Sequence, residues 1–310
     1  MNEVSKVQQP RYLEWTLLQV HAEWIKVRRT LLVVTFATIA LVVAGQLLAY
    51  RNVADLILAF RGMDGAGFDP PGSPGFVGTV VGQAPREFQA LTAAHGQDSA
   101  VAFLAGSFLG ALLLCLAGAS FSGSEWDRRM SLPAFAFNPI RVLAVKLACA
   151  VLSGICITLV AMLSGIIVNA YITGRVENIL PGFSDLAATS KWPSLEVVFL
   201  TSILCAAPAA IGFFGGLILR RTASGALIGV GLYVLDATAT GFLNLIPPGI
   251  LPFSALSSTI RATAPQIQDA GTFALMTTVA DDGSLPPGLS LIAALVILGS
   301  FGWLNFKQGA

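Results

Sequence analysis

Six long apolar stretches constrain this chain more than any other feature of its sequence. Each has about 20 residues or more, the length that an α-helix needs to cross a hydrocarbon core of roughly 30 Å. They run approximately over residues 30–50, 99–122, 142–171, 195–219, 225–246 and 288–306. Only 11% of the residues are charged, whereas soluble domains carry about 25%. We therefore expect an all-α polytopic membrane protein in which residues 1–310 form a single transmembrane domain.

The segment before the first span, residues 11–29, has the pattern of an amphipathic helix. Its apolar residues repeat at intervals of three and four, so they fall on one side of a helix with charged residues on the flanks. Trp15, Trp24, Arg28 and Arg29 are residue types expected where such a helix meets lipid headgroups. We predict that this helix lies in the membrane interface. The alternative is a short soluble helix that merely precedes the first span.

The distribution of basic residues predicts the orientation of the spans. With a cytoplasmic N-terminus, most of the 18 Lys and Arg residues fall on the cytoplasmic side, where membrane proteins concentrate them. These residues are Lys6, Arg11, Lys26, Arg28, Arg29, Arg128, Arg129, Arg141, Lys146, Arg220, Arg221 and Lys307. Both termini are accordingly predicted to be cytoplasmic. The first apolar stretch is too long for a signal peptide and is expected to stay as an anchor.

Proline and glycine predict interruptions and close contacts within the spans. Pro208 lies inside the fourth span, lacks a backbone donor and should kink the helix. Three glycine pairs have the spacing that lets two helices approach closely. They are Gly106 with Gly110, Gly212 with Gly216, and Gly225 with Gly229. The apolar run 251–260 is too short to cross a membrane, so we predict a re-entrant or interfacial segment on the outer side.

Three polar residues inside the spans are candidates for a substrate path. Asp236 is the only ionisable residue near the middle of any span, where an unpaired carboxylate is costly. It either lines a pathway or holds the fifth helix to a neighbour through Thr238, Thr240 or a backbone group. Asn169 and Gln46, nearer the outer ends of their spans, are further candidates of the same kind.

No motif indicates catalysis, or binding of a nucleotide or a metal, by this chain. It lacks the GxxxxGK[ST] phosphate loop, the GxSxG elbow and the HExxH zinc motif, and its two His residues are isolated. Cys115, Cys149, Cys156 and Cys205 all lie in apolar runs and are predicted to be reduced packing residues. We expect no catalytic residue, no metal or cofactor bound by the chain, and no nucleic-acid partner.

The polar interval between the second and third spans is the candidate docking site. From Gly123 to Lys146 it reads GSEWDRRMSLPAFAFNPIRVLAVK, with two prolines that break the backbone. We predict a short charged helix over residues 125–132 that engages a soluble partner. The predicted docking residues are Glu125, Trp126, Asp127, Arg128, Arg129, Met130, Pro139 and Arg141.

This layout resembles the ABC type-2 permease family, the membrane subunits of many bacterial ATP-driven exporters. The shared features are an amphipathic N-terminal helix, six spans with both ends inside, and a charged turn between spans two and three. The matching positions of the turn are Glu125, Ser131, Pro139, Arg141 and Lys146. Arg128 and Arg129, where small residues are usual, and the additional Pro133 depart from the family's pattern.

The resemblance implies a membrane subunit of an ABC exporter in a bacterial plasma membrane, with an outer re-entrant segment between spans five and six. Such a subunit pairs with a second copy or a paralogue and with two nucleotide-binding ATPase subunits, which hold ATP and Mg and engage the turn as a coupling helix. The apolar spans favour an amphipathic substrate such as a drug, a peptide or a lipid. The alternative is a proton-coupled secondary transporter that uses Asp236, although no inverted repeat is visible in the sequence.

Overall fold

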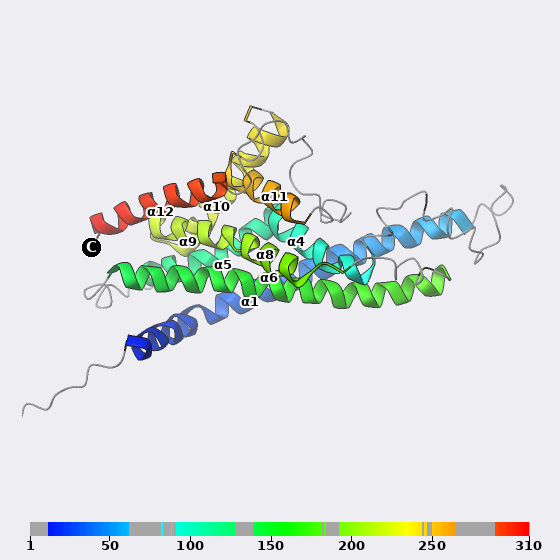
Figure 1. Ribbon diagram of the computed structural model, residues 1–310, viewed down its shortest axis with the longest axis horizontal. Helices are drawn as coiled ribbons and strands as arrows, with labels where there is room; N and C mark the ends of the chain where they lie inside the picture. Colours follow the sequence, from blue (N-terminus) through cyan, green and yellow to red (C-terminus); the bar gives the residue numbers. More distant parts are fainter. Residues whose placement is uncertain are drawn as a thin grey trace, which may run out of the picture.

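The computed structural model of the protein is entirely helical apart from turns and connecting residues, over the part of the chain that it describes. That part comprises residues 12–61, 82, 88, 91–127, 139–181, 183, 192–243, 245–246, 250–264 and 289–309. The elements in chain order are α1 (Tyr12–Arg61), η1 (Ala93–His95), α4 (Gly96–Gly106), α5 (Phe108–Asp127), α6 (Pro139–Ile179), α8 (Leu195–Cys205), α9 (Ala207–Leu219), α10 (Thr222–Asp236), η2 (Ala237–Phe242), α11 (Pro252–Thr263) and α12 (Leu289–Gly309) (Figure 1). The prediction of an all-helical protein is thus confirmed.

Four helical segments among the described residues are long and apolar enough to cross a membrane, where the sequence predicts six. They are Leu17–Ala59, Ile140–Ile179, Leu195–Leu219 and Thr222–Thr240. Helices α4 and α5 are bent by 75° relative to each other. Counted together as one broken span, they make a fifth. The apolar part of α12, Leu291–Asn305, is shorter. These helices are those of a membrane-embedded protein.

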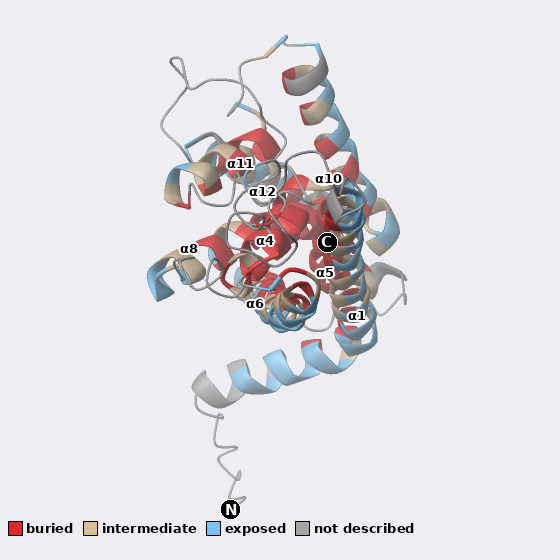
Figure 2. Ribbon diagram, turned by 90° about the vertical axis from the view of Figure 1, so that its right-hand side faces the viewer, coloured by how far each residue is buried: buried red, intermediate tan, exposed pale blue. Residues whose placement is uncertain are grey.

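Helix α5 lies at the centre of the bundle. It packs against α9, α10, α1 and α6, and Figure 2 shows the buried residues of α4 and α5 surrounded by other helices. Large side chains such as Phe103, Leu114 and Phe213 fill the main apolar cluster. The outer faces carry exposed apolar side chains instead, for example Phe36 on α1 and Leu163 on α6. An apolar exterior around an apolar interior is the pattern of a helix bundle solvated by lipid.

Helices α1 and α6 run side by side along the long axis of the molecule (Figure 1). With 50 and 41 residues, they are about 75 and 60 Å long at a rise of about 1.5 Å per residue, which is about twice the thickness of a hydrocarbon core. The expected spans 30–50 and 142–171 are therefore only the middle parts of longer helices. After Pro139 at the start of α6, no proline lies within either helix, so each can continue beyond its apolar stretch.

The far ends of α1 and α6 have an apolar cluster of their own. Residues 51–61, which follow the first predicted span, continue α1 in the structure. Together with the end of α6 and residues before η1, they bury eight apolar side chains. These are Val53, Ile57, Phe88, Leu91, Ile172, Val176, Leu180 and Phe183. The cluster explains why two helices can project past the bundle and stay paired.

The predicted interfacial helix, residues 11–29, is the first part of α1 and no break separates it from the span. Its first turns swing away from the direction of the rest of α1, and Figure 2 shows them as an exposed arm below the bundle. Leu17, Val20 and Trp24, the apolar side of the predicted amphipathic helix, are exposed, whereas Val27 is buried. An exposed apolar side is compatible with a position in the membrane interface, which stays a prediction.

The predicted second span, residues 99–122, is broken at Ser107. Ser107 has an extended backbone (ψ 148°), and its hydroxyl accepts a hydrogen bond of 2.9 Å from the backbone N–H of Gly110, so it caps the start of α5. A Cβ on Gly110 would lie 2.7 Å from the Cα of Leu104. Gly110 therefore permits the bend itself, because its close contact is with α4 residues just before the break and not with another span.

The kink predicted at Pro208 is confirmed as an interruption between α8 and α9. Helix α8 ends at Cys205, Ala206 forms a turn, and Pro208 stands in the first turn of α9, where its missing N–H is not needed. The predicted fifth span, residues 225–246, consists of α10 and the short π-helix η2, which ends at Phe242. The apolar run 251–260 falls within α11, most of whose first six residues are fully buried against the bundle.

Glycines bring α5, α9 and α10 into backbone contact. A Cβ on Gly118 of α5 would overlap the carbonyl of Ala209, and one on Gly212 of α9 would overlap the carbonyl of Cys115. Gly225 of α10 meets the backbone of Gly216 in the same way. Two of the three glycine pairs found in the sequence thus lie at helix–helix contacts, and these contacts fix the spacing of the three central helices.

Candidate functional site

Chain segments that are distant in sequence meet at one end of the bundle, which we call the basic end. Here the ends of α5 and α9 and the start of α10 come together, because Gly123 packs on the backbone of Arg221 and Thr222. The arm of α1 and the start of α6 join them through an ion pair described below. The basic residues of this end whose side chains the structure describes are Lys26, Arg28, Arg29, Arg141, Lys146, Arg220 and Arg221. The side of the membrane that this end faces stays a prediction.

The predicted docking turn connects α5 to α6 at the basic end. Glu125, Trp126 and Asp127 form the last turn of α5, not a separate helix, because no residue between Gly123 and Asp127 stops the helix. Arg128, Arg129 and Met130 lie outside the described residues. Pro139 begins α6 at the position where proline is best tolerated, and Arg141 follows in the first turn. The turn therefore connects two long helices, α5 and α6.

A buried ion pair joins α1 to α6 just beyond this turn. The carboxylate oxygen Oε1 of Glu23 lies 3.5 Å from Nζ of Lys146 and accepts a hydrogen bond of 3.1 Å from Nζ of Lys26. The side chains of Glu23 and Lys146 are only 4% and 3% exposed. Breaking a buried pair of this kind is strongly destabilising because the remaining charge is left without compensation. The pair thus couples the arm of α1 to the first turns of α6.

Asp236 is fully buried and caps another helix. Its Oδ2 accepts hydrogen bonds from the backbone N–H groups of Phe253 and Ser254, each 2.7 Å long. Its Oδ1 accepts a hydrogen bond of 3.3 Å from the hydroxyl of Thr240. Phe253 and Ser254 stand in the first turn of α11, whose own N-cap residue, Leu251, supplies no side-chain bond. A carboxylate at a helix N-terminus also interacts favourably with the helix dipole.

This geometry supports one of the two roles that the sequence leaves open for Asp236. The carboxylate holds the end of α10 to α11 through a backbone group, with Thr240 as a further donor. Thr238 takes no part, because its hydroxyl donates to the carbonyl of Val234 in its own helix. No side of Asp236 is open to a pathway in this structure, since its exposure is 0%.

Tyr233, one turn before Asp236, ties the same region to the break between α4 and α5. Its hydroxyl donates a hydrogen bond of 2.7 Å to the carbonyl of Gly106, the last residue of α4. Its ring meets the ring of Phe253 edge-on at 5.3 Å and that of Phe108 at 6.1 Å. Tyr233 and Asp236 together therefore connect α10 to α4, α5 and α11.

Gln46 and Asn169 bond to backbone carbonyls on either side of η1, where α4 begins. The side-chain amide of Gln46 donates to the carbonyls of Gly96 and Gly165, at 3.3 Å each. The amide of Asn169 donates to the carbonyl of Thr92 at 3.0 Å. Gly96 and Gly165 touch backbone to backbone, so Gln46 of α1 clamps α4 and α6 at their point of contact. The structure thus brings these two substrate-path candidates together at α4, but not with Asp236.

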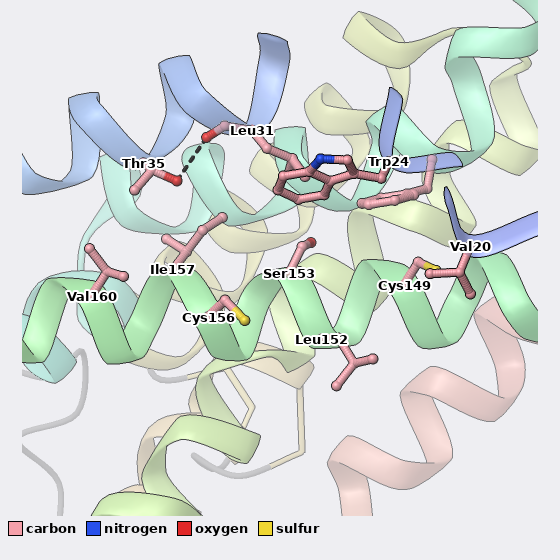
Figure 3. A pocket seen from close by; sticks show the side chains of 11 residues that line it. Val20, Trp24, Leu31, Thr35, Cys149, Leu152, Ser153, Cys156, Ile157 and Val160 are labelled. Carbon is pink, nitrogen blue, oxygen red and sulfur yellow. Dashed lines mark hydrogen bonds between the residues drawn. The ribbon is translucent and has the colours of Figure 1, made fainter. Parts of the chain in front are cut away.

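The predicted interfacial residues border an apolar groove between α1 and α6. The groove has a volume of about 260 Å³ and passes beside Trp24, Leu31 and Thr35 on one wall and Cys156 and Val160 on the other. Figure 3 shows the indole of Trp24 lying across the space between the two helices. Arg28 and Arg29 are exposed on the same stretch of α1. The side chain of Trp15 lies outside the described residues.

Sequence reasoning missed Glu23 and Tyr233. Glu23 was placed on the flank of an amphipathic helix, yet it falls on the buried face formed with Val27, Leu31 and Val34, whose spacing of four, four and three was visible in the sequence. Tyr233 gave no signal, because nothing local indicates that its hydroxyl meets Gly106. Both residues became recognisable only once their partners in α6 and α4 were placed.

Two further observations bear on the chemistry of the chain. Within the described part, no group of three or more His, Cys, Asp or Glu side chains is arranged to hold a metal ion. In comparisons with known proteins, no family model, curated protein or solved structure matches this chain.

Proposed function

We propose that the protein is the membrane-spanning subunit of an ATP-binding-cassette exporter, with the turn between α5 and α6 as the site that docks the ATPase. One observation carries the proposal. The turn lies between helix ends that are tied to the arm of α1 by the buried Glu23–Lys146 pair and to α10 by the contact of Gly123. A push on the turn therefore acts on several helices at once. This is the mechanical arrangement that a coupling segment needs.

The distribution of charge supports a cytoplasmic position for the docking site. Membrane proteins concentrate Lys and Arg on the cytoplasmic side, and the basic end is the end that carries the turn. With this end in the cytoplasm, both termini are cytoplasmic, and a cytoplasmic ATPase reaches the turn from solution. The chain itself has no phosphate-binding loop, so ATP and Mg belong to two separate nucleotide-binding subunits.

The rest of the assembly follows from the size of the chain. One chain of this size makes half of a translocation pathway, so a second copy or a paralogue completes it. The apolar faces of the bundle suit an amphipathic cargo such as a drug, a peptide or a lipid, which would be moved outward across a bacterial plasma membrane.

The test is charge reversal in the turn. Arg128→Glu with Arg129→Glu should abolish co-purification of a soluble ATPase with the tagged chain and abolish the ATPase activity of the purified complex. Each desolvated charge pair lost at an interface costs about 2 to 5 kcal/mol. Arg175→Glu is the matched control, because Arg175 is exposed near the far end of α6 and its reversal should change neither readout. Unchanged co-purification and ATPase activity in the double variant would refute the docking site.

The rival proposal, a secondary transporter driven by protons through Asp236, gains nothing from the geometry. Its key carboxylate is engaged by two backbone N–H groups and a hydroxyl, and a proton carrier has to exchange with water. Transport by the purified chain alone in vesicles with an imposed pH gradient, without ATP, would favour this alternative.

A further inference from the structure

The groove between α1 and α6 has the dimensions of one membrane leaflet. Its lining on α6 extends from Cys149 to Val160, a rise of about 16 Å at 1.5 Å per residue. One leaflet of a hydrocarbon core about 30 Å thick measures about 15 Å. The groove begins near the basic end, beside the Glu23–Lys146 pair, and runs toward the middle of the bundle. Its length and position therefore match a single lipid chain that enters from one side of the membrane.

The walls of the groove are apolar and partly open. Phe121 of α5 and Ile157 of α6 are buried behind it, whereas Trp24, Leu152 and Cys156 are exposed at its edges. Figure 3 shows Trp24 of α1 on one side of the space and Cys156 and Ile157 of α6 on the other, with Thr35 bonded to the backbone of its own helix at Leu31. The hydroxyl of Ser153 likewise donates to the carbonyl of Ala150 in its own helix. Because the lining is almost entirely apolar, the groove suits a hydrocarbon chain.

A positive charge borders the groove-facing stripe of α1. Val20, Trp24, Leu31 and Thr35 line the groove. Arg28 lies four residues after Trp24 and three before Leu31, next to these side chains on the helix surface, and it lines an adjoining hollow together with Ile25, Lys26 and Arg29. Arg28 and Arg29 are exposed, and among the described residues neither has an acidic partner. The nearest carboxylate in sequence, Glu23, is already engaged by Lys26 and Lys146. The two guanidinium groups are thus free to bind a phosphate.

We propose that the groove between α1 and α6 binds one acyl chain of an anionic phospholipid, whose phosphate is held by Arg28 with Arg29 beside it. Trp24 lies one turn before Arg28, at the headgroup level where tryptophan is favoured. The bound lipid fills the gap between the arm of α1 and α6 next to the ion pair that joins them. This site depends only on the protein being embedded in a membrane and is independent of the proposed transport function.

The native cysteines make the site testable without labels. Cys156 lines the groove and is exposed, whereas Cys115 and Cys205 are fully buried and report on unfolding. The full chain is reconstituted in nanodiscs of phosphatidylcholine, with or without phosphatidylglycerol, and the modification of Cys156 by a small uncharged maleimide is followed by peptide mass spectrometry. Phosphatidylglycerol should slow the modification of Cys156. Two basic residues near anionic lipid correspond to a preference of roughly ten- to thirty-fold in binding.

Two sets of variants test the headgroup contact and the acyl-chain contact separately. Arg28→Gln with Arg29→Gln should remove the difference between the two lipid compositions, whereas Arg51→Gln near the far end of α1 should preserve it. Ser153→Phe fills the groove and should reduce the number of phosphatidylglycerol molecules that stay bound in native mass spectrometry, whereas Leu163→Phe, on an exposed face outside the groove, should not.

Three results would overturn the proposal. Equal protection of Cys156 by both lipid compositions would mean that the groove holds any lipid without reading its charge. A preference that survives loss of both arginines would place the anionic site elsewhere. If Ser153→Phe leaves the retention of phosphatidylglycerol unchanged, the acyl chain does not lie between α1 and α6. Modification of Cys115 or Cys205 would identify any variant that has unfolded. If the Arg28→Gln, Arg29→Gln variant unfolds, Arg28→Lys with Arg29→Lys replaces it. This variant keeps both charges and should retain the preference for phosphatidylglycerol.

Discussion

The α5–α9–α10 core and the α1–α6 pair are held together in opposite ways. In the core, glycines let backbones touch, so that a single added methyl group meets a carbonyl. In the α1–α6 pair, side chains make the connections: the Glu23–Lys146 ion pair near the basic end, the Gln46 clamp in the middle and an apolar cluster at the far end. Between the first two of these lies the groove. The core therefore fixes a geometry, whereas the α1–α6 pair retains space for a ligand or a movement.

The largest effect is expected from a methyl group inside the core. Gly118→Ala should destabilise the protein by about 3 kcal/mol, because the added Cβ overlaps the carbonyl of Ala209 and forces α5 and α9 apart. Thermal unfolding of the purified protein in one detergent measures the change. Gly231→Ala on α10 is the control, since a Cβ there meets no atom within 4 Å and should be neutral or stabilising by up to about 1 kcal/mol. Equal stability of the two variants would mean that the core is not tightly packed.

A smaller effect is expected from the ion pair of the α1–α6 pair. Lys146→Met should cost about 2 kcal/mol, because it leaves the buried carboxylate of Glu23 with Lys26 alone. The double variant Glu23→Gln with Lys146→Met should recover part of this loss, since no buried charge is then left uncompensated. Unfolding measurements on the two single variants and the double variant give the coupling energy. Additive losses would show that the two side chains do not interact, and α1 would then be held to α6 by apolar contacts only.

The same contrast explains how far the sequence predicted the structure. Helical type, apolar spans and the interruption at Pro208 are local consequences of composition and of the missing N–H of proline, so they could be read directly. Helix length could not be predicted in this way, because the extension of α1 beyond Tyr50 is stabilised by Ile172, Val176 and other residues more than a hundred positions away. The bend at Ser107 was missed for a related reason. Its signal, a Gly–Ser–x–x–Gly run, also has the spacing of an ordinary helix contact.

The candidate sites follow the same rule. Asp236, Gln46 and Asn169 were found because polar residues in apolar spans are conspicuous. Their partners were not found, since each one bonds to the backbone of a distant segment, and backbone groups leave no trace in a sequence. Glu23 was assigned to the wrong face of its helix. A charged residue near the start of an amphipathic helix is normally taken as part of the polar face.

The capping carboxylate should have a moderate effect. Asp236→Asn should destabilise the protein by about 1 kcal/mol, because the amide oxygen still accepts a bond from the first turn of α11 but the negative charge at its N-terminus is lost. Asp236→Ala should cost more, since two buried backbone N–H groups then lack a partner. Hydrogen exchange should rise in α11 while the exchange of α1 and α6 stays unchanged. A uniform increase over all helices would contradict a local capping role.

The smallest effect sharpens the distinction between the core and its connections. Tyr233→Phe removes only the hydroxyl that donates to Gly106 and leaves both ring contacts, with Phe108 and Phe253, in place. Hydrogen bonds between membrane helices contribute about 0.6 kcal/mol on average, so the unfolding midpoint should fall only slightly. The bend between α4 and α5 should nevertheless loosen, because Gly106 ends α4 at the break and Tyr233 is the side chain from α10 that holds it. Hydrogen exchange of the amides around Ser107 should therefore increase clearly, although the global stability falls only slightly.

Thr238→Val is the control. It removes a hydroxyl from the same region that bonds only within its own helix, and it should leave the exchange near Ser107 unchanged. If both variants raise the exchange at the break equally, the bend is held by packing of α4 and α5 alone.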